Sequence, residues 1–189
     1  MNRHPEVAKQ IVLSENDYVL SALIAAQLRT RPHHCYENAY PTFFAVPQLF
    51  EPYGLFIEGW IVFIHQDAVV LMEHGYLMSG THLIDPTIVL EVDFDEPLYY
   101  FPGVIREREE LEKLENEFFP HVRFEEYGDD GMAHPAYRAA YEAARQKALS
   151  LATGGKTVKE VRAKHLTQEE LGMTIVVVPM NQEEQHNGE

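Results

Sequence analysis

The chain has 189 residues, of which 46% are hydrophobic and 11% aromatic, so it can bury a core and does not have a disordered composition. Its formal net charge is −15, and no local cluster of basic residues opposes that field. Phosphate backbones and anionic lipid surfaces are repelled by such a charge, which argues against nucleic acid and membrane as partners.

Cysteine usage and the N-terminal residues together predict a cytoplasmic protein. The single cysteine, Cys35, permits no internal disulfide, which is typical of a reducing compartment. The first residues, MNRHPEVAKQ, contain no apolar run after their charges, so no signal peptide is expected. No stretch approaches the roughly 18 uninterrupted apolar residues of a membrane span.

The first two expected elements are helices. Residues 14–30 have apolar side chains at helical spacing, and Ser14 is followed by Asp17 at the distance typical of an N-terminal cap. The segment RPHH ends this helix because proline is poorly tolerated inside one. A second, shorter helix is expected over part of residues 35–46, where Pro41 leaves its extent open.

A β-sheet is expected in the middle of the chain. Residues 55–64, 68–78 and 81–92 are rich in β-branched and aromatic residues, and the short segments HQD and SG separate them. This pattern predicts a meander of three antiparallel strands.

Helices dominate the expected C-terminal part. Residues 97–103 are expected to be irregular, and residues 104–118 and 134–152 to be helical. TQEEL at 167–171 has capping-box spacing, and TIVVVP at 174–179 is a candidate strand.

The order of helix, helix, sheet and helices predicts an α+β fold. One domain is expected over residues 1–180, followed by a disordered polar tail at 181–189. Within the domain, a catalytic core is expected at about 14–95 and a helical part at about 103–180.

The hairpin of the second and third strands brings a histidine and an aspartate to one face. If Ser79 and Gly80 form a two-residue turn, His74 lies directly across from Asp85. If the turn is Gly80–Thr81 instead, the two are diagonal neighbours on the same face. A three-residue loop would place them on opposite faces, so the prediction depends on turn length. A carboxylate beside the imidazole can fix its tautomer and stabilise the imidazolium.

Cys35 is the candidate nucleophile that this pair would serve. The string HHCYENA places it in the first turn of the expected helix, where the dipole favours a thiolate and free N–H groups can hold a developing oxyanion. A lone cysteine is more often a buried apolar residue, and a lone strand histidine is more often a satisfied polar one. The combination of both with an aspartate is what indicates a Cys-His-Asp site.

The strings HCYENA, FIEGW and EHGYLMSGTHLIDPT resemble the transglutaminase-like and papain-like superfamily of cysteine hydrolases. More narrowly, they resemble small bacterial and phage proteins with C-x-N-A, E-G-aromatic, H-(A/G)-aromatic and D-x-T motifs. The resemblance covers roughly residues 30–92, about a third of the chain. It implies a papain-like fold, in which a nucleophile helix packs on an antiparallel sheet and further helices follow.

The resemblance also implies the roles of individual residues. It assigns the nucleophile to Cys35, the base to His74 and the orienting carboxylate to Asp85. This sequence departs from the pattern at Gly75–Tyr76, where Ala-Trp is commoner, and at Pro41, which falls early in the nucleophile helix. Residues 93–189 have no counterpart in the pattern.

Asn38, Glu58 and Trp60 are candidates for substrate binding or oxyanion support. Asn38 matches the helix after the nucleophile, and Glu58 and Trp60 match the middle motif. For Glu58, a place near the cleft and a simple exposed strand carboxylate are both open. Trp60 is expected in the core or in the cleft wall. Glu73 precedes His74 and therefore points to the opposite strand face.

Two alternatives to an enzyme stay open. A metal could be held by ligands drawn from a set of nearby residues, namely His33, His34, Cys35, His74 and Asp85. Adjacent histidines rarely converge on one ion, however, and no C-x-x-C or H-E-x-x-H spacing supports zinc. A binding protein could also have inherited the fold without turnover.

The sequence therefore predicts a cysteine hydrolase or acyltransferase that acts on an amide of a peptide or protein through a thioester. No cofactor and no metal are expected. The triad does not separate peptidase, amidase, deamidase and transglutaminase-like reactions, and it leaves the oligomeric state open.

Overall fold

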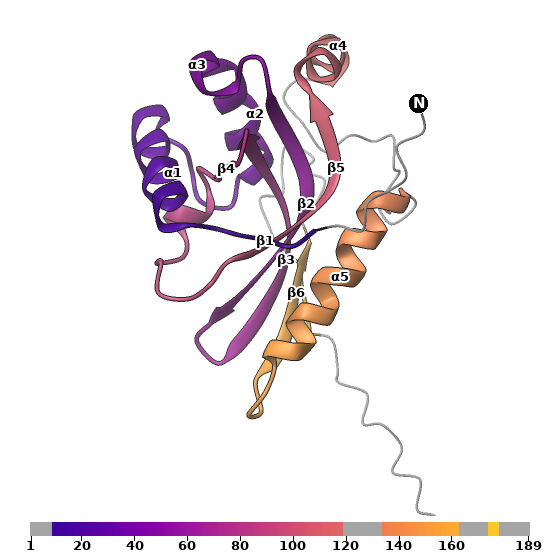
Figure 1. The fold of residues 1–189 in the computed structure, drawn as a ribbon. Coiled ribbons are helices and arrows are strands. Elements are labelled where there is room, and N and C mark those ends of the chain that lie inside the picture. Colours follow the sequence, from indigo (N-terminus) through magenta and orange to yellow (C-terminus); the bar gives the residue numbers. More distant parts are fainter. Residues whose placement is uncertain (1–8, 119–133, 163–173, 178–189) are drawn as a thin grey trace, which may run out of the picture.

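A computed structural model of the chain describes residues 9–118, 134–162 and 174–177, which form an α+β fold around a mixed sheet (Figure 1). The strands are β1 (Ile11–Val12), β2 (Gly54–His65), β3 (Ala68–Ser79), β4 (His82–Ile84), β5 (Tyr99–Glu107), β6 (Thr157–Arg162) and β7 (Thr174–Val177). The helices are α1 (Glu15–Leu28), α2 (Cys35–Ala45), α3 (Pro47–Phe50), α4 (Arg108–Phe118) and α5 (Pro135–Leu151), with a 3-10 turn η1 (Ile88–Leu90).

The sheet of the described residues has seven strands in the order β1-β5-β2-β3-β6-β7, and β4 pairs with β3 beside this path. All neighbouring strands are antiparallel except β3 and β6, which are parallel. The expected antiparallel sheet is therefore a mixed one, because the chain passes through α5 before β6 joins β3 in the same direction.

Several expected elements are confirmed. Ser14 caps α1, since its Oγ accepts the N–H of Asp17 at 3.1 Å. The short second helix begins at Cys35 and contains Pro41. The helix expected over 134–152 is α5, and the late strand is β7 in the described part of its range.

The structure expected for residues 97–107, an irregular segment followed by the start of a helix, was wrong. Tyr99–Glu107 forms β5, and the helix begins only at Arg108. The cause is tertiary: β2 is buried on both faces, so it needs a hydrogen-bonded neighbour on each side, and β5 supplies the second one. The third strand is also shorter than expected, because it ends at Ile84 and η1 replaces its second half.

The C-terminal part also differs from the expected series of helices. Residues 157–162 form β6, a strand that the sequence analysis did not predict. The capping-box segment at 167–171 and the tail at 181–189 lie outside the described residues. Among the described residues, no helix combines the length and the apolar character needed to cross a membrane.

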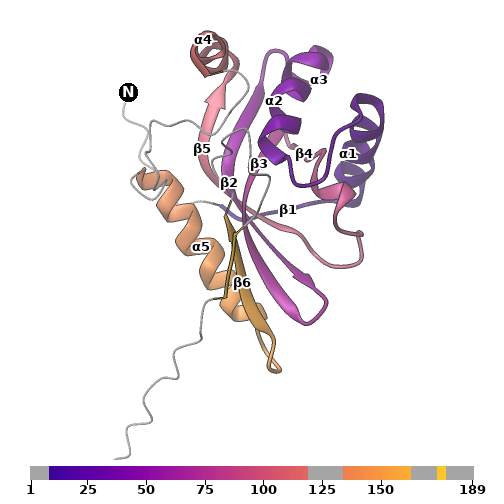
Figure 2. The ribbon, with the colours of Figure 1, turned by 180° about the vertical axis from the view of Figure 1, so that it is seen from behind.

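Two groups of helices pack against the same face of the twisted sheet. On β2, Phe56 belongs to the apolar cluster under α2, while Trp60 and Val62 belong to the cluster under α5. The alternate residues Ile57 and Ile61 face the other side of the sheet and its own cluster. In Figures 1 and 2, α1, α2 and α3 lie toward one end of β2 and β3, and α5 lies farther along toward the other.

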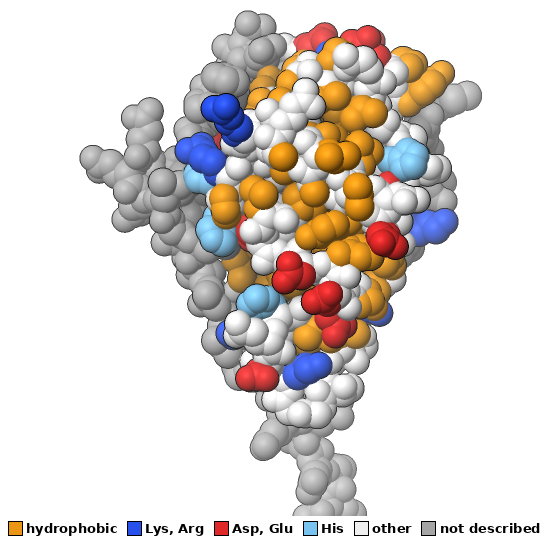
Figure 3. Space-filling model, turned by 90° about the vertical axis from the view of Figure 1, so that its left-hand side faces the viewer, with side chains coloured by type: hydrophobic (Ala, Val, Ile, Leu, Met, Phe, Trp, Pro, Cys, Tyr) orange, Lys and Arg blue, Asp and Glu red, His pale blue; other side chains and the backbone are white. Residues whose placement is uncertain are grey.

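Helix α1 forms the outer side of this arrangement. Its residues Ser21, Ile24 and Ala25 are buried, whereas Val19 and Leu23 are exposed. Figure 3 shows that hydrophobic side chains gather on this side of the molecule. The buried side of α1 contacts β4 and η1, which places Ser21 close to the end of β4.

Strand β3 changes its partner beside His74. Its residues 68–72 pair with β6 and residues 77–79 pair with β4, so residues 73–76 lie at an interruption of the ladder on that edge in the described chain. Helix α2 packs on β3 there, with the ring of Tyr36 lying on Gly75. A Cβ at Gly75 would come within 2.7 Å of Tyr36 Cδ1, so the close contact of helix and strand requires glycine.

The fold therefore predicts that Gly75→Ala pushes α2 away from β3. Overpacking of this kind costs about 1–3 kcal/mol of unfolding free energy. Urea denaturation of Gly75→Ala, Tyr36→Leu and the double variant would measure it. In the double variant the smaller side chain relieves the clash, so its loss should be smaller than the sum of the single losses. Additive losses would show that the contact between Tyr36 and Gly75 does not limit the position of α2.

Candidate active site

The hairpin of β3 and β4 places His74 against Asp85. Facing pairs such as Leu77 with Ile84 show that the turn is Gly80–Thr81. The register with a Ser79–Gly80 turn was wrong, and the alternative with diagonal neighbours is confirmed. Gly80 has φ +60°, which glycine adopts without the penalty that a side chain would bring.

His74 and Asp85 form a buried hydrogen-bonded pair. The distance from His74 Nε2 to Asp85 Oδ2 is 2.7 Å, and the exposed fractions of the two side chains are 1% and 0%. Because both partners are removed from water, their interaction is screened far less than that of a surface pair.

The Asp85 carboxylate accepts hydrogen bonds on both oxygens. Oδ2 accepts the Tyr100 hydroxyl at 2.8 Å in addition to His74, and Oδ1 accepts the N–H groups of Thr87 and Ile88 at 3.0 Å each. Burial alone would raise the pKa of this carboxyl, but the charge of His74 and these bonds lower it below its usual range. Asp85 is therefore held as an anion.

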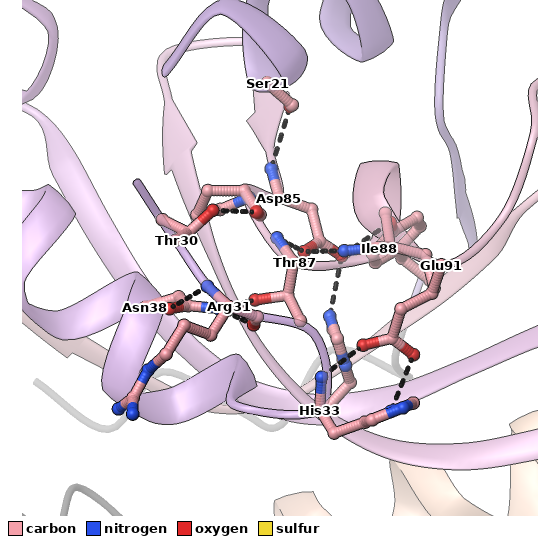
Figure 4. Close-up of polar contacts among 12 residues, drawn as sticks. Ser21, Thr30, Arg31, His33, Asn38, Asp85, Thr87, Ile88 and Glu91 are labelled. Carbon is pink, nitrogen blue, oxygen red and sulfur yellow. Dashed lines mark hydrogen bonds and ion pairs between the residues drawn. The ribbon is translucent and has the colours of Figure 1, made fainter. Parts of the chain in front are cut away.

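The backbone of Asp85 is also fixed. Its N–H donates to Ser21 Oγ at 2.9 Å, a bond that ties the end of β4 to α1 (Figure 4). The carboxylate is thus positioned by its own main chain as well as by its acceptor bonds.

The imidazole of His74 has its two nitrogens in different surroundings. Burial lowers its pKa, but Asp85 and then Cys35 act in the opposite direction, and the pKa lies well above its usual value. Since Asp85 is an acceptor, Nε2 carries a proton. The other nitrogen, Nδ1, is buried and makes no hydrogen bond to the described residues. Cys35 is among the groups that raise the pKa of the ring, so the thiol lies near it, and Nδ1, which does not bind Asp85, is the nitrogen that can exchange a proton with sulfur.

Cys35 is the first residue of α2 and is a half-buried free thiol. The residue before it, His34, is the N-cap, but its side chain makes no hydrogen bond to the backbone N–H groups of the first turn. The helix start beside the sulfur is therefore not capped by that side chain, and its N–H groups can serve an oxyanion.

Three contacts tie the loop before Cys35 to the segment after Asp85 (Figure 4). Thr30 Oγ1 donates to the Pro86 carbonyl at 2.8 Å, and the His33 N–H donates to Glu91 Oε1 at 2.6 Å. The third contact is made by the side-chain amide of Asn38, which binds Arg31 and Thr87. His33 has φ +63°, a conformation that favours glycine, so its bond to Glu91 helps to hold a strained residue.

Asn38 links both segments through its amide. Its Oδ1 accepts the Arg31 N–H at 3.1 Å, and its Nδ2 donates to the Arg31 carbonyl at 2.6 Å and to Thr87 Oγ1 at 2.9 Å. Both amide hydrogens are thus used within the protein. Asn38 lies close to the site, and its contacts suit a residue that positions the loop before Cys35.

Glu58 and Trp60 lie on the sheet face that α2 and α5 cover. Glu58 is buried and its Oε1 accepts Arg106 Nε at 3.0 Å, so it is not an exposed strand carboxylate. Glu58 and Glu73 both raise the pKa of the Tyr36 hydroxyl, after burial as the largest cause, which places them near the first turn of α2. Trp60 is fully buried against Tyr137 and Tyr141 of α5.

Several residues of the site were not foreseen from the sequence. Ser21 could have been found, because it stands four residues after Asp17 on the otherwise apolar buried side of α1. Tyr100 gave no signal, since its segment was expected to be irregular. The hydroxyl of Thr87 and the carboxylate of Glu91 gain their partners only through the long-range fold.

Two of the residues considered as metal ligands, His33 and His34, contact other side chains. The ring of His33 is 3.4 Å from Glu91 through Nδ1, and that of His34 is 3.9 Å from Glu37. Within the described ranges, the structure contains no group of three or more His, Cys, Asp or Glu side chains that could hold one metal ion.

Comparison of the chain with protein-family models, with curated proteins and with solved structures finds no match. The resemblance of its motifs to the cysteine hydrolase superfamily therefore stays a prediction, and the geometry of the site has to carry any functional argument.

The raised pKa of His74 predicts how stability depends on pH. The folded-state value lies above the unfolded value of about 6.5, so the pair stabilises the fold fully below that pH and loses this contribution as pH rises through the folded value. The unfolding free energy of wild type should exceed that of His74→Gln by more at about pH 6 than at about pH 10. Urea unfolding at both pH values would test this. If the difference in unfolding free energy between wild type and His74→Gln instead grew with pH, His74 would be buried in its neutral form.

The amide network of Asn38 predicts a further effect on stability. Asn38→Ala removes three hydrogen bonds and leaves buried groups without partners, which should cost about 3 kcal/mol. Thr87→Val removes one of them and should cost about 1 kcal/mol. Thermal and urea unfolding would measure both. Equal losses would show that the bonds to Arg31 contribute nothing.

Proposed function

We propose that this protein is a cysteine-dependent hydrolase or acyltransferase of papain-like or transglutaminase-like type, with Cys35 as nucleophile, His74 as base and Asp85 as its orienting carboxylate. The observation that carries the proposal is the direction of the imidazole. Its Nε2 is fixed by a buried anion, its Nδ1 is free of hydrogen bonds, and the free thiol at the start of α2 lies near enough to raise the pKa of the ring.

In the proposed reaction the thiolate of Cys35 attacks the carbonyl carbon of an amide and forms a C–S bond. The backbone N–H of Cys35 donates to the oxyanion. As the C–N bond breaks, the imidazolium of His74 transfers its proton to the leaving amine, and a thioester remains on Cys35.

The thioester is then released by water or by a second amine. His74 Nδ1 takes a proton from the attacking molecule, the C–S bond breaks, and the thiolate is restored. Water gives a carboxylic acid, whereas an amine gives a new amide. Hydrolysis, deamidation and acyl transfer therefore share the same residues, and the proposed substrate is an amide of a peptide or protein.

The buried carboxylate has a defined part in this chemistry. Asp85 stays ionised through its bonds to Tyr100, Thr87 and Ile88, so it stabilises the imidazolium without taking the proton itself. Because the reaction needs a reduced thiol, a cytoplasmic location belongs to the proposal.

An electrophilic acyl probe tests the proposal. Wild type and three variants, Cys35→Ala, His74→Ala and Asp85→Asn, would be treated with an activated fluorescent ester, and adducts located by mass spectrometry. We expect wild type to be acylated at Cys35, Cys35→Ala to give no adduct, and His74→Ala to react about a hundredfold more slowly, as expected for the loss of a general base. Asp85→Asn should be slowed as well, because the amide no longer fixes the tautomer of His74.

The chain provides a matched control for the histidine. His82 Nδ1 is 2.8 Å from Asp17 Oδ1, but this side chain is 61% exposed and lies across the β3–β4 hairpin from Ser79. His82→Ala should therefore react with the probe at the wild-type rate. Thermal unfolding of every variant separates loss of chemistry from loss of fold. Equal acylation of wild type and a folded His74→Ala would contradict the proposal.

A further inference from the structure

The Tyr100 hydroxyl shares Asp85 Oδ2 with His74, at distances of 2.8 and 2.7 Å. We propose that Tyr100 is a positioning residue of this site, whose hydroxyl keeps the Asp85 carboxylate ionised and aimed at His74. The inference rests on the proposed function, because a positioning role has meaning only if His74 activates Cys35. It adds a residue from β5, at a distance from the motifs that suggested the triad.

The contact is fixed by the sheet. Tyr100 is fully buried and pairs with Ile61 of β2 and Ile11 of β1, so its backbone is held on both sides. Its ring meets that of Tyr76 at a centroid distance of 4.9 Å and an interplanar angle of 69°. With both neighbours in place, the phenol has little freedom to turn away from Asp85, and Asp85 in turn keeps its direction toward His74.

The hydroxyl is suited to act as a permanent donor. Burial and the negative charge of Asp85 raise the pKa of Tyr100 well above its usual value, so the phenol keeps its proton wherever the site would work. Tyr100 can therefore stabilise the anion without bringing a second positive charge that would compete with the imidazolium.

The other groups around Asp85 define what Tyr100 contributes. Strand β3 contributes His74 and the ring of Tyr76, and α1 contributes Ser21, whose Oγ accepts the Asp85 N–H. The segment after β4 contributes two backbone N–H donors, those of Thr87 and Ile88. The backbone donors both bind Oδ1. Apart from His74, Tyr100 is thus the donor that binds Oδ2 among the described residues.

Loss of this hydroxyl has a defined consequence. With one donor fewer, the carboxylate becomes more basic and takes up a proton at higher pH, as expected when a hydrogen bond to the charged form is removed. A protonated Asp85 no longer stabilises the imidazolium. The acid side of the pH profile for Cys35 reactivity should therefore move to higher pH.

Tyr76 provides a close control. Its hydroxyl is also fully buried on the same face of the sheet, and its ring contacts Tyr100, yet it makes no hydrogen bond. Tyr76→Phe therefore removes a hydroxyl from the same region without removing a hydrogen bond to the carboxylate. A role of Tyr100 in packing alone predicts equal behaviour for Tyr100→Phe and Tyr76→Phe.

The experiment measures the rate of Cys35 alkylation by iodoacetamide across pH for wild type, Tyr100→Phe, Tyr76→Phe and His74→Ala, with thermal unfolding of each. We expect the acid midpoint of Tyr100→Phe to rise by about one pH unit, as for one lost bond to a carboxylate. Below that midpoint, alkylation should be about tenfold slower than in wild type. Tyr76→Phe should follow the wild-type profile.

A second variant keeps the contact in case Tyr100→Phe does not fold. Site-specific replacement of Tyr100 by 3-fluorotyrosine strengthens the donor and should move the acid midpoint to lower pH. A Tyr100→Phe or fluorotyrosine profile that coincides with wild type, while His74→Ala is slowed, would overturn the inference and leave the proposed function standing. Alkylation of folded His74→Ala at the wild-type rate would instead overturn the proposed function.

Discussion

The buried carboxylate of Asp85 is the constraint on which the arrangement of this site depends. An ionised group without water is costly unless all of its acceptor positions are used, and here β3, β5 and the turn after β4 supply the donors. Its N–H reaches α1 through Ser21. A single side chain therefore fixes the relative positions of elements that are distant in sequence, and His74 takes its orientation from that fixed point.

The second half of the site is joined to this anchor by close packing and by short polar links. The ring of Tyr36 lies on Gly75. Because Cys35 directly precedes Tyr36, this contact brings Cys35 to the strand that carries His74. Asn38 connects the loop before Cys35 to Thr87, two residues beyond Asp85. The resemblance to the cysteine hydrolases predicted a glycine or alanine after the histidine. The position of the Tyr36 ring explains why this chain has glycine there.

Local patterns were enough to predict α1, the start of α2 and the β2–β3 hairpin. Alternation along β3 and β4 also placed His74 and Asp85 on one face, because the period of a strand is fixed by its geometry. The register itself could not be settled, since Ser79–Gly80 and Gly80–Thr81 are both acceptable two-residue turns. Only the paired residues of the folded hairpin distinguish them.

Long-range requirements decided what local patterns could not predict. The charged residues after 103 have helical character, yet β2 is buried on both faces and takes residues 99–107 as its neighbour. The bond of Tyr100 to Asp85 follows from that choice, so the sequence of its segment alone could not have suggested it. In the same way, the amide of Asn38 matched a motif, but its bonds to Arg31 and Thr87 depend on the packed fold.

The interruption on the edge of β3 is where a local part of the site meets a long-range one. His74 and Asp85 are eleven residues apart within one hairpin, so the acid–base pair closes a short loop. Cys35 lies on a helix that precedes β2 in the sequence and packs on this hairpin at the interruption of the β3 ladder. The bond between His74 and Asp85 therefore lies within one hairpin, whereas Cys35 comes close to it only through the packing of α2 on β3.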